Sequence, residues 1–376
     1  MLIAPSRATH SQRLLQMLLD DGHSVTFIDY QNPQPESADR YTFIELSKHP
    51  LPRWVRTNYL RIVWKNWTVA LNLRRVWKKI QPDVVHVVDI EKRAYRCALA
   101  RIHPLILTSF GSDINDLFEK DDQGSRQWKE VARALQTADH ITADSYQVLE
   151  RCEFIAGRFL NKSLFYFGID LELFKPRNVG ETQALRSKLG IPSGAKVILS
   201  ARRFIPKMRQ DIVLRAFAEI LKCNLKVVLV YRRFGVLVEY EDELRVLAKQ
   251  LGIANQIIWV DEMDYEQIPL LYNLANVIVN VPEQDGLPVT LFEASACMKP
   301  VITTDLPAYQ EFLSAGEYIR VPVGDVAKLA EAIKLVLADN KSLIEQLGKN
   351  YELVLKTANQ KKCLSGLNLI YSQAIG

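Results

Sequence analysis

The chain has 376 residues, of which 48% are hydrophobic and 24% charged, and it carries a formal net charge of +5. This ordinary globular composition excludes a disordered or collagen-like chain, and the length favours two domains over one. No apolar run reaches the roughly 20 residues that a bilayer-spanning helix requires. The first residues, MLIAPSR, lack the charged segment and cleavage site of a secretory signal, so we expect a cytoplasmic protein.

Short β-branched apolar runs recur along the chain and predict strands, at residues 24–28, 84–88, 105–108, 196–200, 227–230, 257–260, 277–281 and 301–303. Amphipathic segments between them predict helices, for example at residues 212–221, 241–250, 267–274 and 326–337. Continuous apolar runs are typical of strands that are buried on both faces of a parallel sheet. We therefore predict an α/β chain with two doubly wound, Rossmann-like domains.

This series of strands and helices runs twice, with a break near residues 168–177. A strand-like run at 164–167 ends at Gly168, and Pro176 begins a polar stretch that continues to Gly194. We interpret the break as a hinge between domains at residues 1–172 and 173–355; the alternative is a surface loop within one large sheet. Two such domains facing each other would form a cleft at the carboxyl ends of their strands, where open α/β sheets bind ligands.

Several common site motifs are missing from the sequence. It has no GxGxxG, no GxxxxGK[ST] and no GxSxG, which disfavours a dehydrogenase, a P-loop enzyme and a hydrolase with a nucleophile elbow. The five cysteines are at least 55 residues apart, which excludes CxxC motifs and is typical of reduced thiols in the cytosol. The six histidines are dispersed, so no metal-ligand cluster is visible in the sequence.

The most informative segment is residues 282–302, in which a predicted strand leads through a short acidic loop into a helix. We predict that the helix begins at Pro288, because proline is favoured at the first helical position, where its missing N–H has no partner to lose. The amino terminus of such a helix binds anions and hydroxyls through its backbone amides. Here those amides belong to Gly286, Leu287, Val289 and Thr290.

Two carboxylates flank this helix start. Asp285 is in the loop and Glu293 is eight residues further on, inside the helix, so together they could hold a polyol at two points. The alternatives are that Asp285 caps the helix and that Glu293 lies on a solvated face. The apolar neighbours Leu291 and Phe292 favour burial of Glu293, and a buried carboxylate needs a partner.

These residues resemble the signature of the retaining glycosyltransferases of family 4, which have the GT-B fold: an acid, seven residues, a glutamate, a small-residue helix and a Pro-Val strand. Three further stretches match that family in the expected order. Residues 200–207 resemble its basic diphosphate loop, and residues 107–113 resemble the loop of its first domain that faces donor and acceptor. Residues 143–145 and 168–174 resemble its approach to the hinge. The resemblance implies the GT-B fold with an interdomain cleft.

The same resemblance implies a catalytic and donor-binding set. A sugar would pass from a nucleotide diphosphate sugar with retention at the anomeric carbon, without an obligatory metal or other cofactor. Glu293 would bind the ribose hydroxyls, Asp285 would contact the transferred sugar, and Arg203, helped by Lys207, would neutralise the leaving diphosphate. Fixed cations make physical sense there, because without a metal the leaving group needs positive charge where its own charge develops. The alternative for the arginines is a solvated pair after a strand.

The implied substrate-binding set is larger. In the second domain it includes the start of the helix (Gly286, Leu287, Pro288 and Thr290), and in the first domain it includes His10, Gly111, Ser112 and Asp113. The family's usual lysine falls at Met208, between Lys207 and Arg209, and its usual histidine falls at Phe110. The tail, residues 356–376, is implied to pack back against the first domain.

The stretch from Leu46 to Pro82 contains no acidic residue and four of the six tryptophans, Trp54, Trp64, Trp67 and Trp77. Its nine cations are Lys48, Arg53, Arg56, Arg61, Lys65, Arg74, Arg75, Lys78 and Lys79. A basic, tryptophan-rich segment suits an anionic membrane surface, so we hypothesise that residues 48–79 contact one. The alternative is a pair of helices whose tryptophans fill the core; a nucleic-acid surface is disfavoured because no binding motif accompanies the charge.

We therefore expect a cytoplasmic glycosyltransferase of the hexosyltransferase type, peripheral at the inner face of a membrane. Its acceptor would be a glycan or a lipid-linked molecule in envelope polysaccharide or glycolipid synthesis. Two alternatives stay open. A GT-B sugar-nucleotide epimerase would use the same carboxylates without an acceptor, and a non-catalytic partner subunit of a glycosylating complex would fit the departures at Met208 and Phe110.

Overall fold

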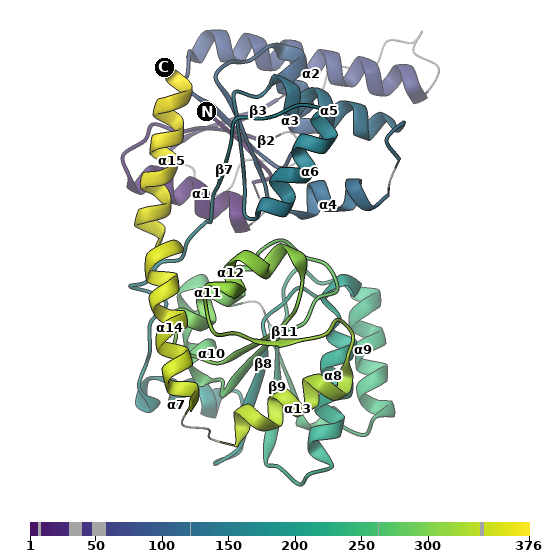
Figure 1. The fold of residues 1–376 in the computed structure, drawn as a ribbon, viewed down its shortest axis with the longest axis vertical. Coiled ribbons are helices and arrows are strands. Elements are labelled where there is room, and N and C mark those ends of the chain that lie inside the picture. The colour runs from purple at the N-terminus through teal and green to yellow at the C-terminus, as the bar shows by residue number, and fades with distance from the viewer. Residues whose placement is uncertain (7–8, 30–39, 47–57, 121, 262, 339–341) are drawn as a thin grey trace. The chain divides into compact units, whose positions relative to one another are not determined.

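The computed structural model describes residues 1–6, 9–29, 40–46, 58–120, 122–261, 263–338 and 342–376. The chain divides into two compact units (Figure 1), Met1–Phe167 with Lys361–Gly376, and Gly168–Gln360. The domain limits at residues 172 and 355 stay a prediction of the sequence.

The first unit holds a parallel sheet in which the described residues form seven strands, in the order β3-β2-β1-β4-β5-β6-β7. The strands are β1 (Leu2–Ile3), β2 (Thr26–Asp29), β3 (Thr42–Glu45), β4 (Val85–Val88), β5 (Leu105–Ser109), β6 (His140–Ala143) and β7 (Lys162–Leu164). Successive residues of a strand point to opposite faces. Both faces are buried here, since Leu2 and Ile3 of β1 belong to two different core clusters. This explains the unbroken apolar runs.

Helices cover both faces of this sheet. One face packs against α1 (Thr9–Asp20) and α15 (Gln360–Ile375). The other packs against α2 (Asn58–Ile80), α3 (Lys92–Ala100), α4 (Ser112–Glu119), α5 (Arg126–Thr137) and α6 (Tyr146–Ala156). The carboxyl-terminal helix α15 is fastened to the sheet by a buried network, in which His86 on β4 contacts the Tyr371 hydroxyl at 2.7 Å and Thr108 Oγ1 at 2.6 Å.

The second unit holds a parallel sheet in which the described residues form six strands, in the order β10-β9-β8-β11-β12-β13. The strands are β8 (Lys196–Ser200), β9 (Val227–Arg232), β10 (Ile257–Val260), β11 (Val277–Asn280), β12 (Val301–Thr304) and β13 (Ile319–Val321). The helices are α7 (Val179–Lys188), α8 (Gln210–Leu221), α9 (Val238–Gln250), α10 (Ile268–Leu274), α11 (Val289–Ala296), α12 (Gln310–Ser314), α13 (Val326–Leu337) and α14 (Ser342–Thr357). Short 3-10 turns are η1 (Pro206–Met208), η2 (Ala254–Gln256), η3 (Tyr265–Gln267) and η4 (Pro307–Tyr309). Helices α8, α9 and α13 pack on one face, through the core cluster of Phe217, Leu244 and Ile333.

Each sheet has one point at which the strand order reverses, between β1 and β4 in the first unit and between β8 and β11 in the second. Loops that leave adjacent strands in opposite directions at such a point open a crevice at the carboxyl edge of the sheet. The loop after β8 and the loop after β11 are the basic and acidic segments that the sequence analysis singled out. The topology therefore brings these two segments to one edge of one sheet.

Several predicted elements have the predicted bounds, including β8, β10 and α13. Two details were wrong. The predicted strand at residues 164–167 is wrong beyond its first residue, because β7 ends at Leu164 and the rings of Phe165 and Phe167 turn into the core beside α1. Pro288 is the residue before α11 rather than its first residue, since its backbone is extended (φ −80°, ψ 135°) and the helix begins at Val289.

Candidate active site

The centre of the site is an ion pair between Asp285, in the loop after β11, and Arg202, in the loop after β8. The carboxylate also accepts a hydrogen bond of 2.9 Å from the hydroxyl of Tyr309 in η4. The Asp285 side chain is 18% exposed and that of Arg202 is 13% exposed, so the pair is largely shielded from water. The Arg202 Nη1 atom lies 3.5 Å from Thr290 Oγ1 in the first turn of α11.

The electrostatics of Asp285 follow from this position. Burial raises the pKa of its carboxyl above the ordinary value, and the Arg202 guanidinium, the Tyr309 hydroxyl and the Gly286 N–H oppose that shift. Gly286 therefore gives its amide to the neighbouring carboxylate. The Asp285 carboxylate is thus a hydrogen-bond acceptor whose position is fixed by the Arg202 guanidinium, the Tyr309 hydroxyl and the Gly286 N–H.

Glu293 lies inside α11 and is 8% exposed, so the solvated-face alternative is wrong. Its carboxylate accepts a hydrogen bond of 2.6 Å from the hydroxyl of Tyr272 on α10. The ring of Tyr272 in turn packs edge-on against Phe174 with centroids 6.0 Å apart. The buried carboxylate thus has the partner that burial demands.

The cations of the basic loop after β8 differ in their exposure to solvent. Arg203 is exposed and lies across Gly235, where an added Cβ would come within 2.8 Å of the guanidinium Nε atom. Lys207, in η1, is partly buried, and its carbonyl accepts a 3.0 Å hydrogen bond from the Glu283 N–H. Lys207 and Arg203 thus place two positive charges on the same loop. Gly235 has φ +54°, a backbone conformation that favours glycine, and the missing Cβ at this position leaves room for the Arg203 side chain.

Met208 and Arg209 complete this loop. Arg209 is committed to other carboxylates, with Nε 3.1 Å from Asp211 Oδ1 and Nη1 3.1 Å from Glu283 Oε2. The sulfur of Met208, at the position of the usual lysine, lies 3.2 Å from Arg202 Nη2. The cation that stands beside Met208 is therefore Arg202.

Two buried guanidinium N–H groups at this edge make no hydrogen bond to any of the residues that the structure describes. They are Nε of Arg202 and Nε of Arg232, the last residue of β9. The Arg232 guanidinium stacks on the Phe234 ring at 4.3 Å. Burial and then Glu293 raise the pKa of the Tyr272 hydroxyl, and the Arg232 charge is close enough to oppose that shift. Together with the start of α11, these groups make the edge a place where an anion is favoured.

The first-unit residues lie at the carboxyl edge of their own sheet. Gly111 precedes α4 with φ +88°, in the region that favours glycine. The Asp113 carboxylate accepts hydrogen bonds from the Ile90 N–H at 2.7 Å and from Ser109 Oγ at 2.6 Å, and the residue is 8% exposed. Asp113 therefore braces the loops after β4 and β5.

His10 and Phe110 are brought together at the same edge. Their rings are stacked with centroids 4.7 Å apart, and the ring of Phe167 lies 4.4 Å from that of Phe110. The imidazole of His10 thus lies next to the position where the family usually has a histidine. Arg7 and Ala8, which complete the turn before His10, lie outside the described residues.

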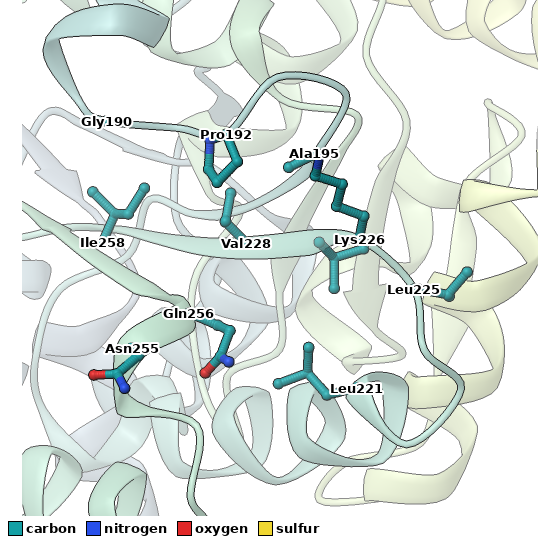
Figure 2. A pocket seen from close by; sticks show the side chains of 11 residues that line it. Gly190, Pro192, Ala195, Leu221, Leu225, Lys226, Val228, Asn255, Gln256 and Ile258 are labelled. Atoms are coloured by element: carbon teal, nitrogen blue, oxygen red, sulfur yellow. The ribbon is translucent and has the colours of Figure 1, made fainter.

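One hollow of the second unit lies away from these residues. Figure 2 shows this hollow of about 330 Å³, lined by Gly190, Pro192, Val228, Gln256 and Ile258 among others. These residues lie at or before the amino ends of β8, β9 and β10, the opposite edge from Asp285. Ligands of open α/β sheets bind at the carboxyl edge, so we do not assign this hollow to the chemistry. Within the described residues, no group of three or more His, Cys, Asp or Glu is arranged to hold a metal ion.

Comparison with known proteins identifies the family. Residues 181–353 match the family described as glycosyl transferases group 1, and residues 1–145 match the family described as glycosyl transferase 4-like. The chain is a glycosyltransferase, with a group 1 region at residues 181–353 and a glycosyl transferase 4-like region at residues 1–145. Its fold is similar to that of Anabaena Alr3699/HepE, solved in complex with UDP and glucose, with a TM-score of 0.81 and 15% identity over 99% of this chain and 98% of that one. Sucrose-phosphate synthase from Thermosynechococcus elongatus has a TM-score of 0.78 and 20% identity, with 99% and 98% covered. The predicted GT-B fold is confirmed.

Curated relatives of this glycosyltransferase include two named D-inositol 3-phosphate glycosyltransferases. The first, from Catenulispora acidiphila, is 28% identical over 213 residues, which is 54% of this chain and 50% of the relative. The second, from Acidothermus cellulolyticus, is 27% identical over 177 residues, 45% of this chain and 39% of the relative. The chain thus spans about half or less of the length of the curated relatives it matches.

Sequence reasoning missed three residues of the site in this glycosyltransferase: Arg202 as the partner of Asp285, Tyr309 as its second donor, and Tyr272 as the partner of Glu293. The only available signal was that Arg202 precedes Arg203 in the same basic loop. The tyrosines lie on elements whose sequences read as ordinary core segments, and both are fully buried.

Proposed function

We propose that the chain is a retaining glycosyltransferase that moves a sugar from a nucleotide diphosphate sugar to a glycan or lipid-linked acceptor in envelope polysaccharide or glycolipid synthesis. The bond between the anomeric carbon and the diphosphate breaks, and a bond to the acceptor oxygen forms on the same face of the sugar. The acceptor proton leaves with the departing diphosphate. The donor would be a nucleotide sugar, and no metal or other cofactor is proposed.

The observation that carries the proposal is the Asp285–Arg202 ion pair at the start of α11, with Glu293 buried in the same helix. Three kinds of group that a sugar diphosphate needs are present at one sheet edge: a carboxylate for hydroxyls, guanidinium groups for phosphate and unpartnered N–H donors. Family membership supports the same reaction class.

We assign roles by position. Asp285 contacts the transferred sugar, and Glu293 binds the ribose hydroxyls through the carboxylate that Tyr272 orients. Arg203, exposed and beside Gly235, and Lys207 neutralise the leaving diphosphate. The start of α11, from Gly286 to Thr290, orients the same groups, and its electrostatic stabilisation is largest where negative charge develops.

We assign the acceptor side to the first unit. Its set is His10 with Gly111, Ser112 and Asp113, of which Asp113 acts by bracing the loops rather than by direct contact. The curated relatives are named for action on D-inositol 3-phosphate, so a polyol phosphate belongs in the acceptor panel beside glycans and polyprenyl-linked sugars.

A donor panel tests the proposal. Thermal shifts with UDP, GDP and ADP sugars should single out one base, since a ligand at 100 times its dissociation constant stabilises a protein by about 2.7 kcal/mol. Product analysis with that donor alone and then with acceptors separates the alternatives. A changed sugar without acceptor indicates an epimerase, and no nucleotide binding by calorimetry indicates a non-catalytic partner subunit.

A further inference from the structure

The long helix α2 presents an apolar strip to solvent. Leu60 is 42% exposed, Trp67 is 51% exposed and Leu71 is 52% exposed. These residues are separated by seven and four positions, which is two turns and one turn of an α-helix, so they line up on one side. Trp64, four residues after Leu60, lies on the same side and is partly buried. We call these four residues the α2 strip.

The α2 strip is not the face that holds the helix in place. The opposite side of α2 packs Val69 and Leu73 into the core of the first unit, with 6% and 0% exposure. On that side Asn66 accepts a hydrogen bond from Arg96 on α3 and donates one to Glu130 on α5. The fold therefore anchors α2 through this opposite side, while Trp67 and Leu71 of the strip stay half exposed.

The charge around the strip has one sign. Arg61, Lys65, Arg74, Arg75, Lys78 and Lys79 are all exposed, and no acidic residue occurs anywhere in α2. Lys78 continues the line of the strip, seven residues after Leu71, while Arg74 and Arg75 flank it. Such a helix, with indole and leucine side chains on one line and cations around them, has the composition of an interfacial helix that lies in the plane of a bilayer.

Other occupants fit this charge less well. In a symmetric dimer the same patch meets itself, which would place six cations against six. A nucleic acid would satisfy the cations but leave the exposed leucines in water. Within the described residues, no helix has the length and apolar character to cross a bilayer, so the helix would lie on a membrane rather than pass through it.

We propose that the α2 strip docks on the surface of an anionic lipid bilayer, with Trp67 and Leu71 at the level of the headgroups and with Arg74, Arg75 and Lys78 against anionic lipid. This names the surface by which the enzyme reaches a lipid-linked acceptor, and in that sense rests on the proposed function. The other cations of the hypothesised stretch, Lys48, Arg53 and Arg56, lie outside the described residues, as does Trp54. The proposal uses only α2.

Flotation of the full chain with vesicles tests the proposal. We expect it to float with phosphatidylcholine vesicles that contain phosphatidylglycerol and not with phosphatidylcholine alone. Added salt should weaken the interaction, because exposed charges are screened. The double variant W67E/L71E should lose binding, and the triple variant R74Q/R75Q/K78Q should weaken it at least tenfold, since each cation near an anionic surface contributes about fivefold.

Matched variants control for surface change alone. Val246→Glu and Leu335→Glu replace side chains that are 53% and 58% exposed on α9 and α13, and these should float like the unmodified chain. Thermal unfolding of every variant should match the unmodified chain, because no changed side chain is in the core. The proposal would be overturned if the unmodified chain floated with neither vesicle type, or if W67E/L71E floated as well as the unmodified chain.

Two further outcomes would also overturn it. Concentration-dependent dimers in analytical ultracentrifugation that W67E/L71E abolishes would assign the strip to a second copy. Equal binding to neutral and anionic vesicles would remove the role of the cations. The test is independent of the proposed function, because donor binding by thermal shift needs no membrane and should be the same in W67E/L71E.

Discussion

Replacing Arg202 with glutamine should destabilise the protein in a pH-dependent way. An opposite charge in contact lowers a carboxyl pKa by about 1 to 3 units, and each unit corresponds to about 1.4 kcal/mol. Burial already raises the pKa of Asp285, so removal of Arg202 lets it rise further. The expected loss of unfolding free energy is therefore about 1.4 to 4 kcal/mol where the carboxylate is ionised.

The sign with pH follows from linkage. An acid with a raised folded pKa binds its proton more tightly when folded, so its contribution to stability falls as pH rises from its ordinary value toward the folded value. Asp285 in R202Q has the higher folded pKa, so the penalty of the variant should be larger at about pH 8 than at about pH 5. Urea unfolding at both values measures the difference.

Arg203→Gln is the control in the same loop. Arg203 is exposed, makes no ion pair among the described residues and lowers the pKa of Asp285 less than Arg202 does, so the unfolding free energy of R203Q should differ from that of the unmodified chain by less than about 0.5 kcal/mol at either pH. Turnover should fall in R203Q all the same, because that residue is assigned to the leaving diphosphate. An R202Q penalty that is absent, or equal at both pH values, would refute the argument that Arg202 holds the charge of Asp285.

Three further substitutions test the packing of both units. Tyr272→Phe removes the donor to buried Glu293 and should cost about 1 to 3 kcal/mol of unfolding free energy and weaken donor binding by calorimetry; unchanged donor affinity would contradict the ribose role. Tyr371→Phe should cost about 1 to 2 kcal/mol in urea unfolding, since His86 loses its partner on α15. Burial and then Asp113 raise the pKa of Asp89 to about 7, so stability should fall as pH rises from about 4 to about 7. Asp89→Asn should remove that fall and raise the unfolding free energy by on the order of 1 to 2 kcal/mol at about pH 8. This figure is discounted because 32% of the Asp89 side chain is exposed to solvent, which screens its charge. A difference in unfolding free energy between the variant and the unmodified chain that stays constant from about pH 4 to about pH 8 would contradict the prediction.

The strands were predictable where burial made their sequences uniform. Both faces of β8 are covered, so apolar residues fill consecutive positions, and the equally apolar β10 is buried at both of its ends; the bounds of both strands could be read directly. The edge strand β3, Thr42–Glu45, has only exposed and half-buried residues, and its sequence carries no such run. The predicted end of β7 was wrong for a related reason. Phe165 and Phe167 are apolar because they pack in the core, although they lie outside the sheet.

The acidic helix start was predictable because its residues are close in sequence, whereas its partners are not. Tyr309 lies 24 residues after Asp285, and Tyr272 lies 21 residues before Glu293. Which tyrosine reaches which carboxylate depends on how η4 and α10 pack on α11, and a single sequence contains no signal for that. The arginine that pairs with Asp285 could not be named from the sequence either, since one step along a loop changes whether Arg202 or Arg203 turns toward that carboxylate.

The two departures from the family pattern bear on whether the site is active, and each is matched by another side chain of this chain. Met208 stands where a lysine is usual, and the Arg202 guanidinium lies 3.2 Å from its sulfur. Phe110 stands where a histidine is usual, and the His10 imidazole stacks on it at 4.7 Å. A subunit released from catalysis would be free to lose a charge or an imidazole without replacement. Retention of both at neighbouring positions therefore favours an enzyme over a non-catalytic partner, and it predicts that R202Q and an H10A variant lose turnover while the fold is kept.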